Sequence, residues 1–231
     1  MDSKGHLGLP FLQIVDRYLL EPLVKRMYPE PRARRVGVRV LREGASGCRI
    51  LCLAGAFCGD TAANWSDWIA DLGERFTEAE IVVVNGFYYY WPEEAEVMQE
   101  IIAEGRTLLA DGRPTVIVSF SFGGLLAKAM VDEAEHHSVR AIVTMATEHR
   151  GHLPRIAETR DVRLGIPLDV DVPIVSFGGW LDMVVWPWTT FTDRSQHHFL
   201  IAGHFAFMRS RAVRSKVITV LDDIVFRNQC A

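Results

Sequence analysis

Apolar residues follow two patterns that alternate along the chain. Continuous apolar runs are typical of strands buried on both faces of a sheet, whereas apolar residues spaced three or four apart are typical of helices that pack on a sheet. Continuous runs predict strands at residues 49–53, 81–84, 115–120, 140–146, 172–177 and 197–202, and an alternating run predicts an edge strand at 36–41. The expected fold class is therefore α/β, a three-layer sandwich in which a mostly parallel sheet has helices on both faces.

Helical spacing extends over residues 61–75, 93–110, 125–133 and 205–226, and also through the first 28 residues. We therefore divide the chain into an N-terminal amphipathic helix with its linker, residues 1–35, and an α/β domain, residues 36–231. The N-terminal helix is expected to pack on the domain. Contact with a membrane surface or a protein partner is the alternative, although its polar face lacks a strong basic bias.

Composition and charge narrow the class of protein. Of the 231 residues, 49% are hydrophobic and 23% are charged, which fits a soluble globular protein with one large core. The net charge is −4 and the sequence contains no dense cluster of basic residues, so we expect no nucleic-acid partner. The four cysteines have neither a disulfide framework nor metal-ligand spacing, so reduced thiols, a cytoplasmic setting and no cofactor or metal are expected. Residues 7–20 are hydrophobic, but Asp16 and Arg17 interrupt them, which disfavours a signal peptide.

Ser121 stands between a predicted strand and a predicted helix. Strand 115–120 ends directly before it, and a phenylalanine and two glycines lead into the helix. Small residues at such a turn let strand and helix approach closely, so the hydroxyl is exposed at the top of the sheet. The stretch matches the nucleophile-elbow pattern G-x-S-x-G except that Ser119 replaces the first glycine. An ordinary serine in a turn fits so short a pattern equally well.

Two more reactive side chains follow predicted strands. Asp182 lies just past strand 172–177, and His204 just past strand 197–202. Active groups of an open parallel sheet gather at the carboxyl ends of its strands, so the fold can bring both side chains to Ser121. An imidazole that removes the serine proton, and a carboxylate that orients the imidazole, turn the hydroxyl into a nucleophile. We therefore expect Ser121, His204 and Asp182 to be catalytic.

Negative charge that develops on the substrate oxygen would need backbone N–H donors. One donor is expected from Phe122, directly after the serine. The other is expected from the loop after strand 49–53, from Ala56 or, as the alternative, from Phe57.

Three stretches of the chain resemble α/β-hydrolases, and more narrowly the lipase and esterase branch that lacks a large cap domain. Residues 53–57, Leu-Ala-Gly-Ala-Phe, resemble the oxyanion stretch of that family, with Ala54 where histidine or proline is common. Residues 145–151, Met-Ala-Thr-Glu-His-Arg-Gly, resemble the Thr-Pro-His-Arg-Gly stretch of bacterial lipases, and residues 182–185 are similar to the acid motif Asp-x-x-Val. The resemblance covers about residues 48–226 and implies a three-layer α/β-hydrolase-like sandwich and hydrolysis of esters.

Other acids and histidines are alternatives to these assignments. Glu148 also follows a strand, at a place where some members of the family carry their acid, but Asp182 is preferred. His197 and His198 lie at the start of a predicted strand, the wrong end for catalysis. His149 and His152 are expected to be hydrogen-bonded loop residues.

Aromatic residues that follow the strands suggest the substrate. Some are expected in the core and others along an apolar cleft. The predicted substrate-binding residues are Tyr88, Trp91, Trp180, Trp186 and Phe205. The segment 148–171, where related enzymes insert a helical cap, is too short for a large lid, so an open site is expected.

Together the side chains and the resemblance predict a serine hydrolase. It would cleave carboxylic esters with apolar acyl groups, small molecules or lipids, through an acyl-enzyme intermediate. Thioesterase chemistry on the same fold is one alternative. The other is a binding module that keeps the fold without catalysis, for which Ser119 and Ala54 are the indications.

Overall fold

The structure is a computed structural model. It describes residues 26, 36–45, 47–56, 64–86, 88, 94–131, 138–150, 164, 166–167, 170–192 and 195–228. Apart from Arg26, the predicted N-terminal helix and linker therefore lie outside the described residues.

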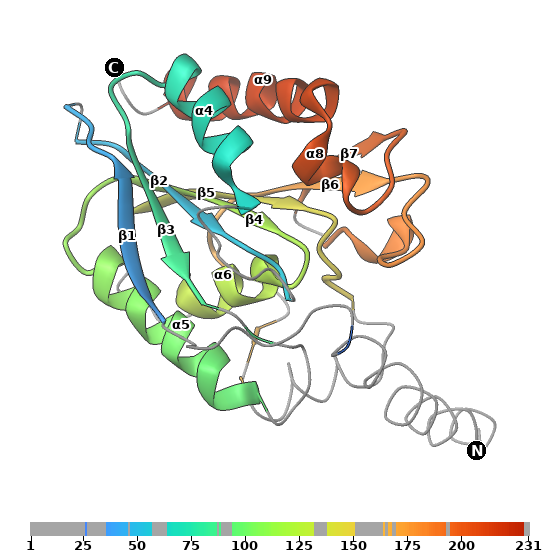
Figure 1. The fold of residues 1–231 in the computed structure, drawn as a ribbon, viewed down its shortest axis with the longest axis horizontal. Coiled ribbons are helices and arrows are strands. Elements are labelled where there is room, and N and C mark those ends of the chain that lie inside the picture. Colours follow the sequence, from blue (N-terminus) through green and yellow to red (C-terminus); the bar gives the residue numbers. More distant parts are fainter. Residues whose placement is uncertain are drawn as a thin grey trace.

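A seven-stranded sheet forms the centre of the domain (Figure 1). Its strands are β1 (Gly37–Arg42), β2 (Arg49–Leu53), β3 (Glu80–Asn85), β4 (Thr115–Phe120), β5 (Val139–Met145), β6 (Ile174–Gly179) and β7 (Gln196–Leu200). They lie in the order β1-β3-β2-β4-β5-β6-β7, and β1 at one edge is antiparallel to β3 whereas all other neighbours are parallel. The predicted mostly parallel sheet, including its edge strand, is confirmed.

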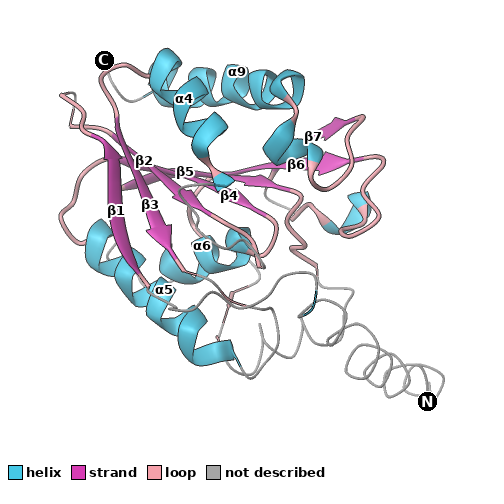
Figure 2. Cartoon of the chain, in the orientation of Figure 1, coloured by secondary structure: helices cyan, strands magenta, loops and turns pink. Residues whose placement is uncertain are grey.

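Helices cover both faces of the sheet (Figure 2). The described helices are α4 (Ser66–Arg75), α5 (Ala95–Leu109), α6 (Gly123–Val131), α8 (Ala206–Arg209), α9 (Arg211–Asn228) and the 3-10 helix η4 (Pro187–Thr189). Helices α5 and α6 lie on one face, and α4, α8 and α9 on the other. The described residues include no cap domain, although residues 151–163 of the predicted short connection lie outside them.

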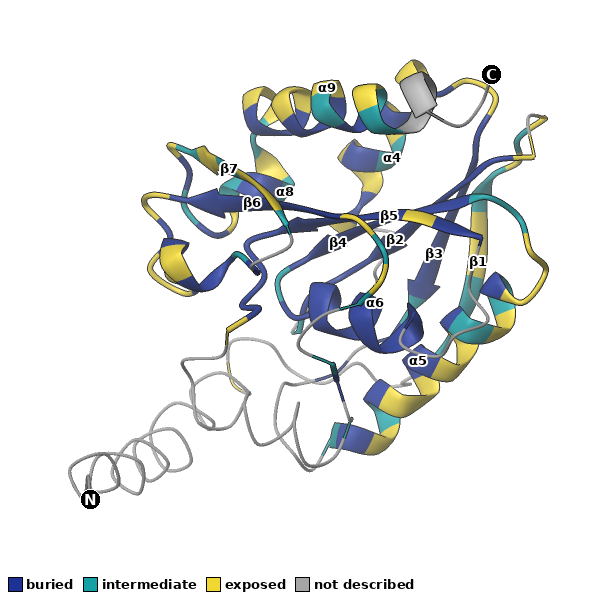
Figure 3. Cartoon of the chain, turned by 180° about the vertical axis from the view of Figure 1, so that it is seen from behind, coloured by how far each residue is buried: buried dark blue, intermediate teal, exposed yellow. Residues whose placement is uncertain are grey.

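The central strands are buried on both faces, which explains their continuous apolar runs (Figure 3). In β2, Ile50 and Cys52 point into the core beneath α4 and α9, and Leu51 and Leu53 point into the core beneath α5 and α6. Both cores therefore rest on the same central strands, with alternate residues of each strand on either side.

The predicted single helix over residues 205–226 is wrong at one position. Ser210 has an extended backbone, with ψ 116°, and separates α8 from α9. Its Oγ accepts a hydrogen bond from the N–H of Val213 at 3.4 Å, so Ser210 acts as the N-cap of α9. Apolar spacing continues on both sides of this residue, which hid the break. None of the described helices combines the length and apolar character needed to cross a membrane.

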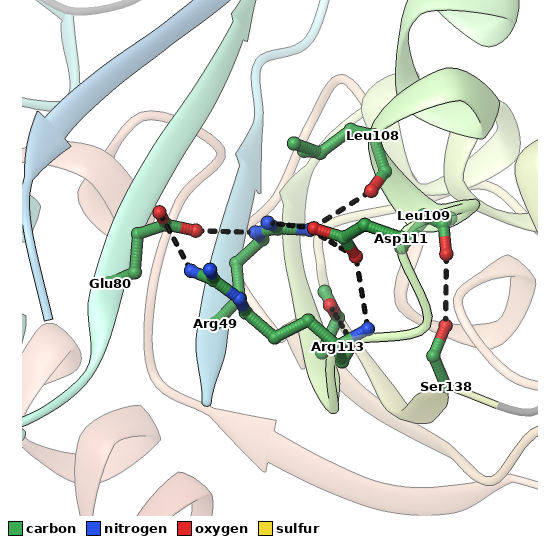
Figure 4. A network of polar contacts seen from close by, with 8 residues as sticks. Arg49, Glu80, Leu108, Leu109, Asp111, Arg113 and Ser138 are labelled. Atoms are coloured by element: carbon green, nitrogen blue, oxygen red, sulfur yellow. Dashed lines mark hydrogen bonds and ion pairs between the residues drawn. The ribbon is translucent and has the colours of Figure 1, made fainter. Parts of the chain in front are cut away.

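A charged network ties the amino ends of the central strands together (Figure 4). Arg49, buried at the start of β2, contacts Glu80 of β3 and Asp111 of the turn before β4, both at 2.6 Å. Arg113 pairs with the second oxygen of Glu80 at 2.8 Å. The hydrogen bond from Arg49 is the main reason why the pKa of Asp111 lies below its usual value. This network lies at the opposite end of β4 from Ser121, so its role is structural.

Candidate active site

Ser121 occupies a sharp turn between β4 and α6 with a left-handed backbone, φ 53°. Non-glycine residues seldom adopt this conformation, and it persists only where the surrounding structure fixes it. A side chain at Gly123 would come within 2.8 Å of the Leu53 carbonyl oxygen, and one at Gly124 would collide with Thr147. The two glycines therefore allow α6 to pack directly against the ends of β2 and β5.

Ser119 fits the place where the elbow pattern has glycine. It lies within β4, paired with Leu53 on one side and Thr144 on the other, and it is fully buried. Its hydroxyl donates to the carbonyl oxygen of Val143 at 3.1 Å. The extra side chain is therefore accommodated without changing the turn at Ser121.

The structure brings Ser121, His204 and Asp182 together. The Nε2 atom of His204 lies 3.2 Å from the Oγ of Ser121, and its Nδ1 atom lies 2.9 Å from Oδ2 of Asp182. The other carboxylate oxygen of Asp182 accepts two backbone hydrogen bonds at 2.8 Å, from the N–H groups of Val184 and Val185. Asp182 and His204 are buried and Ser121 is half-buried. Both carboxylate oxygens of Asp182 are thus hydrogen-bonded, while Ser121 remains partly exposed.

Aromatic rings hold the imidazole of His204 in place. The ring of Phe120 lies 4.8 Å away between centroids, and that of Phe205 stands edge-on at 5.3 Å. Phe120 at the end of β4 and Phe205, the residue after His204, together restrict rotation of the imidazole. Its two nitrogens therefore face the hydroxyl and the carboxylate at the same time.

The alternative residues lie elsewhere. His149 is buried, and its Nε2 lies 3.0 Å from Oγ1 of Thr144. Burial, followed by the charge of Lys128, lowers its pKa to about 3, so it is neutral. His197 stands at the start of β7, with Nε2 3.1 Å from the carbonyl oxygen of Thr192. Glu148 is buried after β5, whereas the carboxylate that contacts His204 is that of Asp182. His152 lies outside the described residues.

The loop after β2 lies against Ser121. A side chain at Gly55 would stand 2.7 Å from Cβ and 3.3 Å from Oγ of Ser121. Ala56 comes directly after Gly55 and is half-buried, and Phe122 follows Ser121. In the described part of the chain, the structure contains no hydrogen bond donated by the backbone N–H of either residue. Phe57, the alternative donor, lies outside that part.

Tyr88 differs from its predicted place on the rim of a cleft. Its side chain is only 1% exposed, and its hydroxyl donates to the carbonyl oxygen of Ala54 at 3.0 Å. Its ring stands edge-on to that of Phe122 at 5.8 Å. Tyr88 therefore supports the loop at Ala54 and the turn at Phe122 from below. Sequence spacing shows that it follows a strand, but not on which side its ring packs.

The other predicted rim aromatics are exposed. Trp180, Trp186 and Phe205 are 59%, 45% and 50% exposed, and Trp91 lies outside the described residues. Trp180 and Trp186 belong to the segment that carries Asp182, and Phe205 follows His204 directly. Further exposed large apolar side chains occur in these segments: Leu181, Met183, Val184, Trp188, Phe199 and Ile201. Exposed apolar side chains therefore lie on the segments that carry Asp182 and His204, and the ring of Phe205 contacts the imidazole of His204.

Thr147 was not predicted to contribute to the site. Its hydroxyl donates to the backbone carbonyl oxygen of Ser121 at 2.8 Å. In the sequence Thr147 follows a buried strand and lies in the stretch 145–151 that resembles Thr-Pro-His-Arg-Gly, but neither feature specifies the target of its hydroxyl.

Comparison with solved structures finds likenesses over most of the chain. MGS-MChE2, an α/β hydrolase enzyme from the metagenome of lagoon sediments at Mar Chica, Morocco, matches with a TM-score of 0.60 and 12% identity, over 82% of this chain and 98% of its own. The Bacillus licheniformis lipase BlEst2 matches with a TM-score of 0.57 and 14% identity, over 83% of this chain and 99% of its own. A lipase-esterase related protein from Clostridium acetobutylicum matches with a TM-score of 0.57 and 9% identity, over 82% and 99%. No protein-family model and no curated protein sequence matches the chain.

Proposed function

The chain has the α/β-hydrolase fold, and from this premise we propose that it is a serine hydrolase that cleaves carboxylic esters. One observation carries the proposal. Ser121, His204 and Asp182 form a continuous series of contacts of 3.2 and 2.9 Å at the carboxyl edge of the sheet. Burial of the histidine and the aspartate keeps this series out of bulk water, while the serine remains within reach of a ligand.

The proposed reaction begins at the Ser121 hydroxyl. With Nδ1–H donated to Asp182, the Nε2 of His204 has a free lone pair and accepts the serine proton as Oγ attacks the carbonyl carbon. The Asp182 carboxylate, held by two backbone N–H groups, keeps the imidazole in this tautomer and stabilises its positive charge.

Two transfers complete the cycle. The imidazolium of His204 gives its proton to the departing alcohol oxygen as the bond between carbonyl carbon and alcohol breaks, which leaves an acyl-Ser121 ester. Water then attacks this ester while His204 accepts a proton from it. The imidazolium returns that proton to Oγ of Ser121 as the bond between the acyl carbon and Oγ breaks, which releases the carboxylic acid. In both tetrahedral states the negative oxygen would accept hydrogen bonds from the N–H groups of Ala56 and Phe122.

The apolar surface around the site favours apolar acyl groups. Trp180, Trp186 and Phe205 expose large rings on the segments that carry Asp182 and His204. Burying a substrate chain against such rings contributes roughly 25 cal/mol per Å² of apolar area removed from water. Esters with several methylene groups in the acyl chain are therefore expected to be hydrolysed faster than acetates.

Thioesterase activity is the second candidate, because the same nucleophile and the same donors serve a thioester carbonyl. The binding module without catalysis is less well supported. The two unusual residues that suggested it leave the turn and loop intact, since Ser119 donates to Val143 and the carbonyl oxygen of Ala54 accepts from Tyr88.

Hydrolysis of p-nitrophenyl butyrate by the parent and by Ser121→Ala tests the proposal. We expect the parent to be active and the variant to lose about 10⁴-fold or more in kcat, with an unchanged melting temperature. Butyryl-coenzyme A assayed in parallel separates an esterase from a thioesterase. An inactive parent on both substrates would favour the binding module.

A further inference from the structure

Thr147 is fully buried, just past the end of β5 and beside the turn that holds Ser121. Its Oγ1 donates to the carbonyl oxygen of Ser121 at 2.8 Å, and the N–H of Ser121 donates to the carbonyl oxygen of Met145, also at 2.8 Å. The left-handed backbone of Ser121 is thus held on both sides by two residues of one neighbouring segment.

Two unusual features of the chain serve this contact. Ala146, between Met145 and Thr147, also has a left-handed backbone, with φ 50°, and its N–H is fixed by the carbonyl oxygen of Phe177 at 2.8 Å. This turn sends the segment from the end of β5 toward Ser121. Gly124 lacks a side chain where any Cβ would collide with Thr147. The left-handed backbone of Ala146, rare for alanine, thus directs Thr147 toward Ser121. The missing side chain at Gly124 leaves space for the side chain of Thr147.

The hydrogen bond from Thr147 also controls a neighbouring N–H group. The carbonyl of Ser121 and the N–H of Phe122 belong to one planar trans peptide, so they point in opposite directions. A donor that fixes the carbonyl therefore fixes the direction of the N–H. It also polarises the peptide, which makes that N–H a stronger donor. The second donor to this carbonyl, the N–H of Gly124 at 3.1 Å, belongs to the same turn and moves with it.

We propose that Thr147 is a positioning residue that holds the Ser121–Phe122 peptide so that the Phe122 N–H faces the developing oxyanion. The inference rests on the proposed hydrolase function and adds a residue to it. Thr147 does not touch the substrate. Its effect should therefore fall on the transition state, where the oxyanion charge is largest, and leave binding of the uncharged ester unchanged.

Thr147→Val removes the hydroxyl at nearly constant shape, and Thr147→Ser keeps it. Thr115→Val is the matched control. Thr115 is equally buried, at the other end of β4, and its hydroxyl donates to the carbonyl oxygen of Arg113 at 2.8 Å. The full chain and these variants are assayed with p-nitrophenyl butyrate for kcat and KM, and with a fluorophosphonate for the rate of inactivation.

Removing one donor to an oxyanion lowers kcat about 10²- to 10³-fold, and a loosened donor should lose less, so we expect Thr147→Val to lower kcat about ten-fold or more. KM should change by less than about two-fold, because ground-state binding is unaffected. Inactivation by the fluorophosphonate, which also places negative charge on an oxygen in the transition state, should slow by a similar factor. Thr147→Ser should recover most of the loss, and Thr115→Val should retain the parent kcat.

Three results would overturn the inference while leaving the hydrolase proposal intact, given an active parent that Ser121→Ala abolishes. The first is a kcat for Thr147→Val close to that of the parent. The second is an equal loss in Thr147→Ser, which would assign the effect to the methyl group and its packing. The third is an equal loss in Thr115→Val, which would show a general effect of removing a buried hydroxyl. A parent without hydrolysis or labelling would overturn the proposed function and this inference with it.

Discussion

Gly55→Ala tests how closely the loop after β2 must approach Ser121. The new Cβ would stand 2.7 Å from Cβ of Ser121, 3.1 Å from the carbonyl oxygen of Phe120 and 3.3 Å from Oγ of Ser121. Non-bonded carbon atoms in proteins lie about 3.5–4.0 Å apart, so the loop and the turn must separate by about 1 Å. Hydrogen bonds hold both segments, through Tyr88 to the carbonyl of Ala54 and through Met145 to the N–H of Ser121. The separation would therefore be forced on the site itself.

A misplacement of about 1 Å in a catalytic constellation lowers the rate on the order of 10²-fold. We expect that loss in kcat for p-nitrophenyl butyrate, because the alanine would separate Ser121 Oγ from the N–H of Ala56. Overpacking of this kind destabilises a protein by about 1–3 kcal/mol, so Gly55→Ala should still fold. Thermal unfolding in parallel measures how much of the loss comes from unfolded protein.

Gly37→Ala is the matched control for this substitution. Gly37 lies in the edge strand β1, and an added Cβ there meets no atom within 4 Å. It should retain the parent kcat. If Gly55→Ala keeps kcat within about three-fold of the parent, or if Gly37→Ala loses as much, the steric reasoning from the loop to the site is refuted.

Three further predictions concern the acid Asp182, the charged network around Arg49, and the buried histidine His149. Asp182→Asn should lower kcat about 10⁴-fold by favouring the wrong tautomer of the imidazole, with little change in thermal stability; a loss under ten-fold would exclude Asp182 as the orienting acid. Arg49→Met should lower the free energy of unfolding by about 3 kcal/mol in urea titrations, because Glu80 stays buried with one partner fewer, and should leave kcat per folded molecule unchanged. The pKa of His149 is lowered from 6.5 to about 3 in the folded chain, so the unfolded chain binds the proton more readily. The stability that neutral His149 contributes is therefore fully present above pH 6.5 and is lost as the pH falls from there toward 3. His149→Gln should flatten unfolding free energy against pH in that range, and an unchanged slope would contradict the assignment.

Much of the fold follows from burial of the strands on two faces. The run Arg49–Leu53 is apolar at almost every position because its alternate residues supply two different cores, and β2 has the predicted bounds. The break at Ser210 could not be found in this way, because the apolar spacing of α8 continues into α9. There a local N-cap hydrogen bond, not periodicity, ends one helix and starts the next.

In the candidate site, too, some residues could be predicted from the sequence and others could not. Positions at strand ends are visible in the sequence, so Ser121, Asp182 and His204 could be placed at one edge before any distance was known. The residues that support these side chains, Tyr88 and Thr147, could not be assigned their contacts from the sequence. The inward packing of Tyr88 and the bond from Thr147 to a backbone carbonyl depend on turns between strands, among them the left-handed backbone at Ala146. The identity of a single alanine does not reveal that its backbone is left-handed.

Covalent labelling of the nucleophile tests the central claim most directly. The full chain is treated with a fluorophosphonate, digested, and the modified residue is identified by mass spectrometry, alongside His204→Ala and Ser121→Ala. The account predicts one adduct on Ser121, formed far more slowly without His204 and absent from Ser121→Ala. An adduct on another residue, or an unmodified parent, would contradict it.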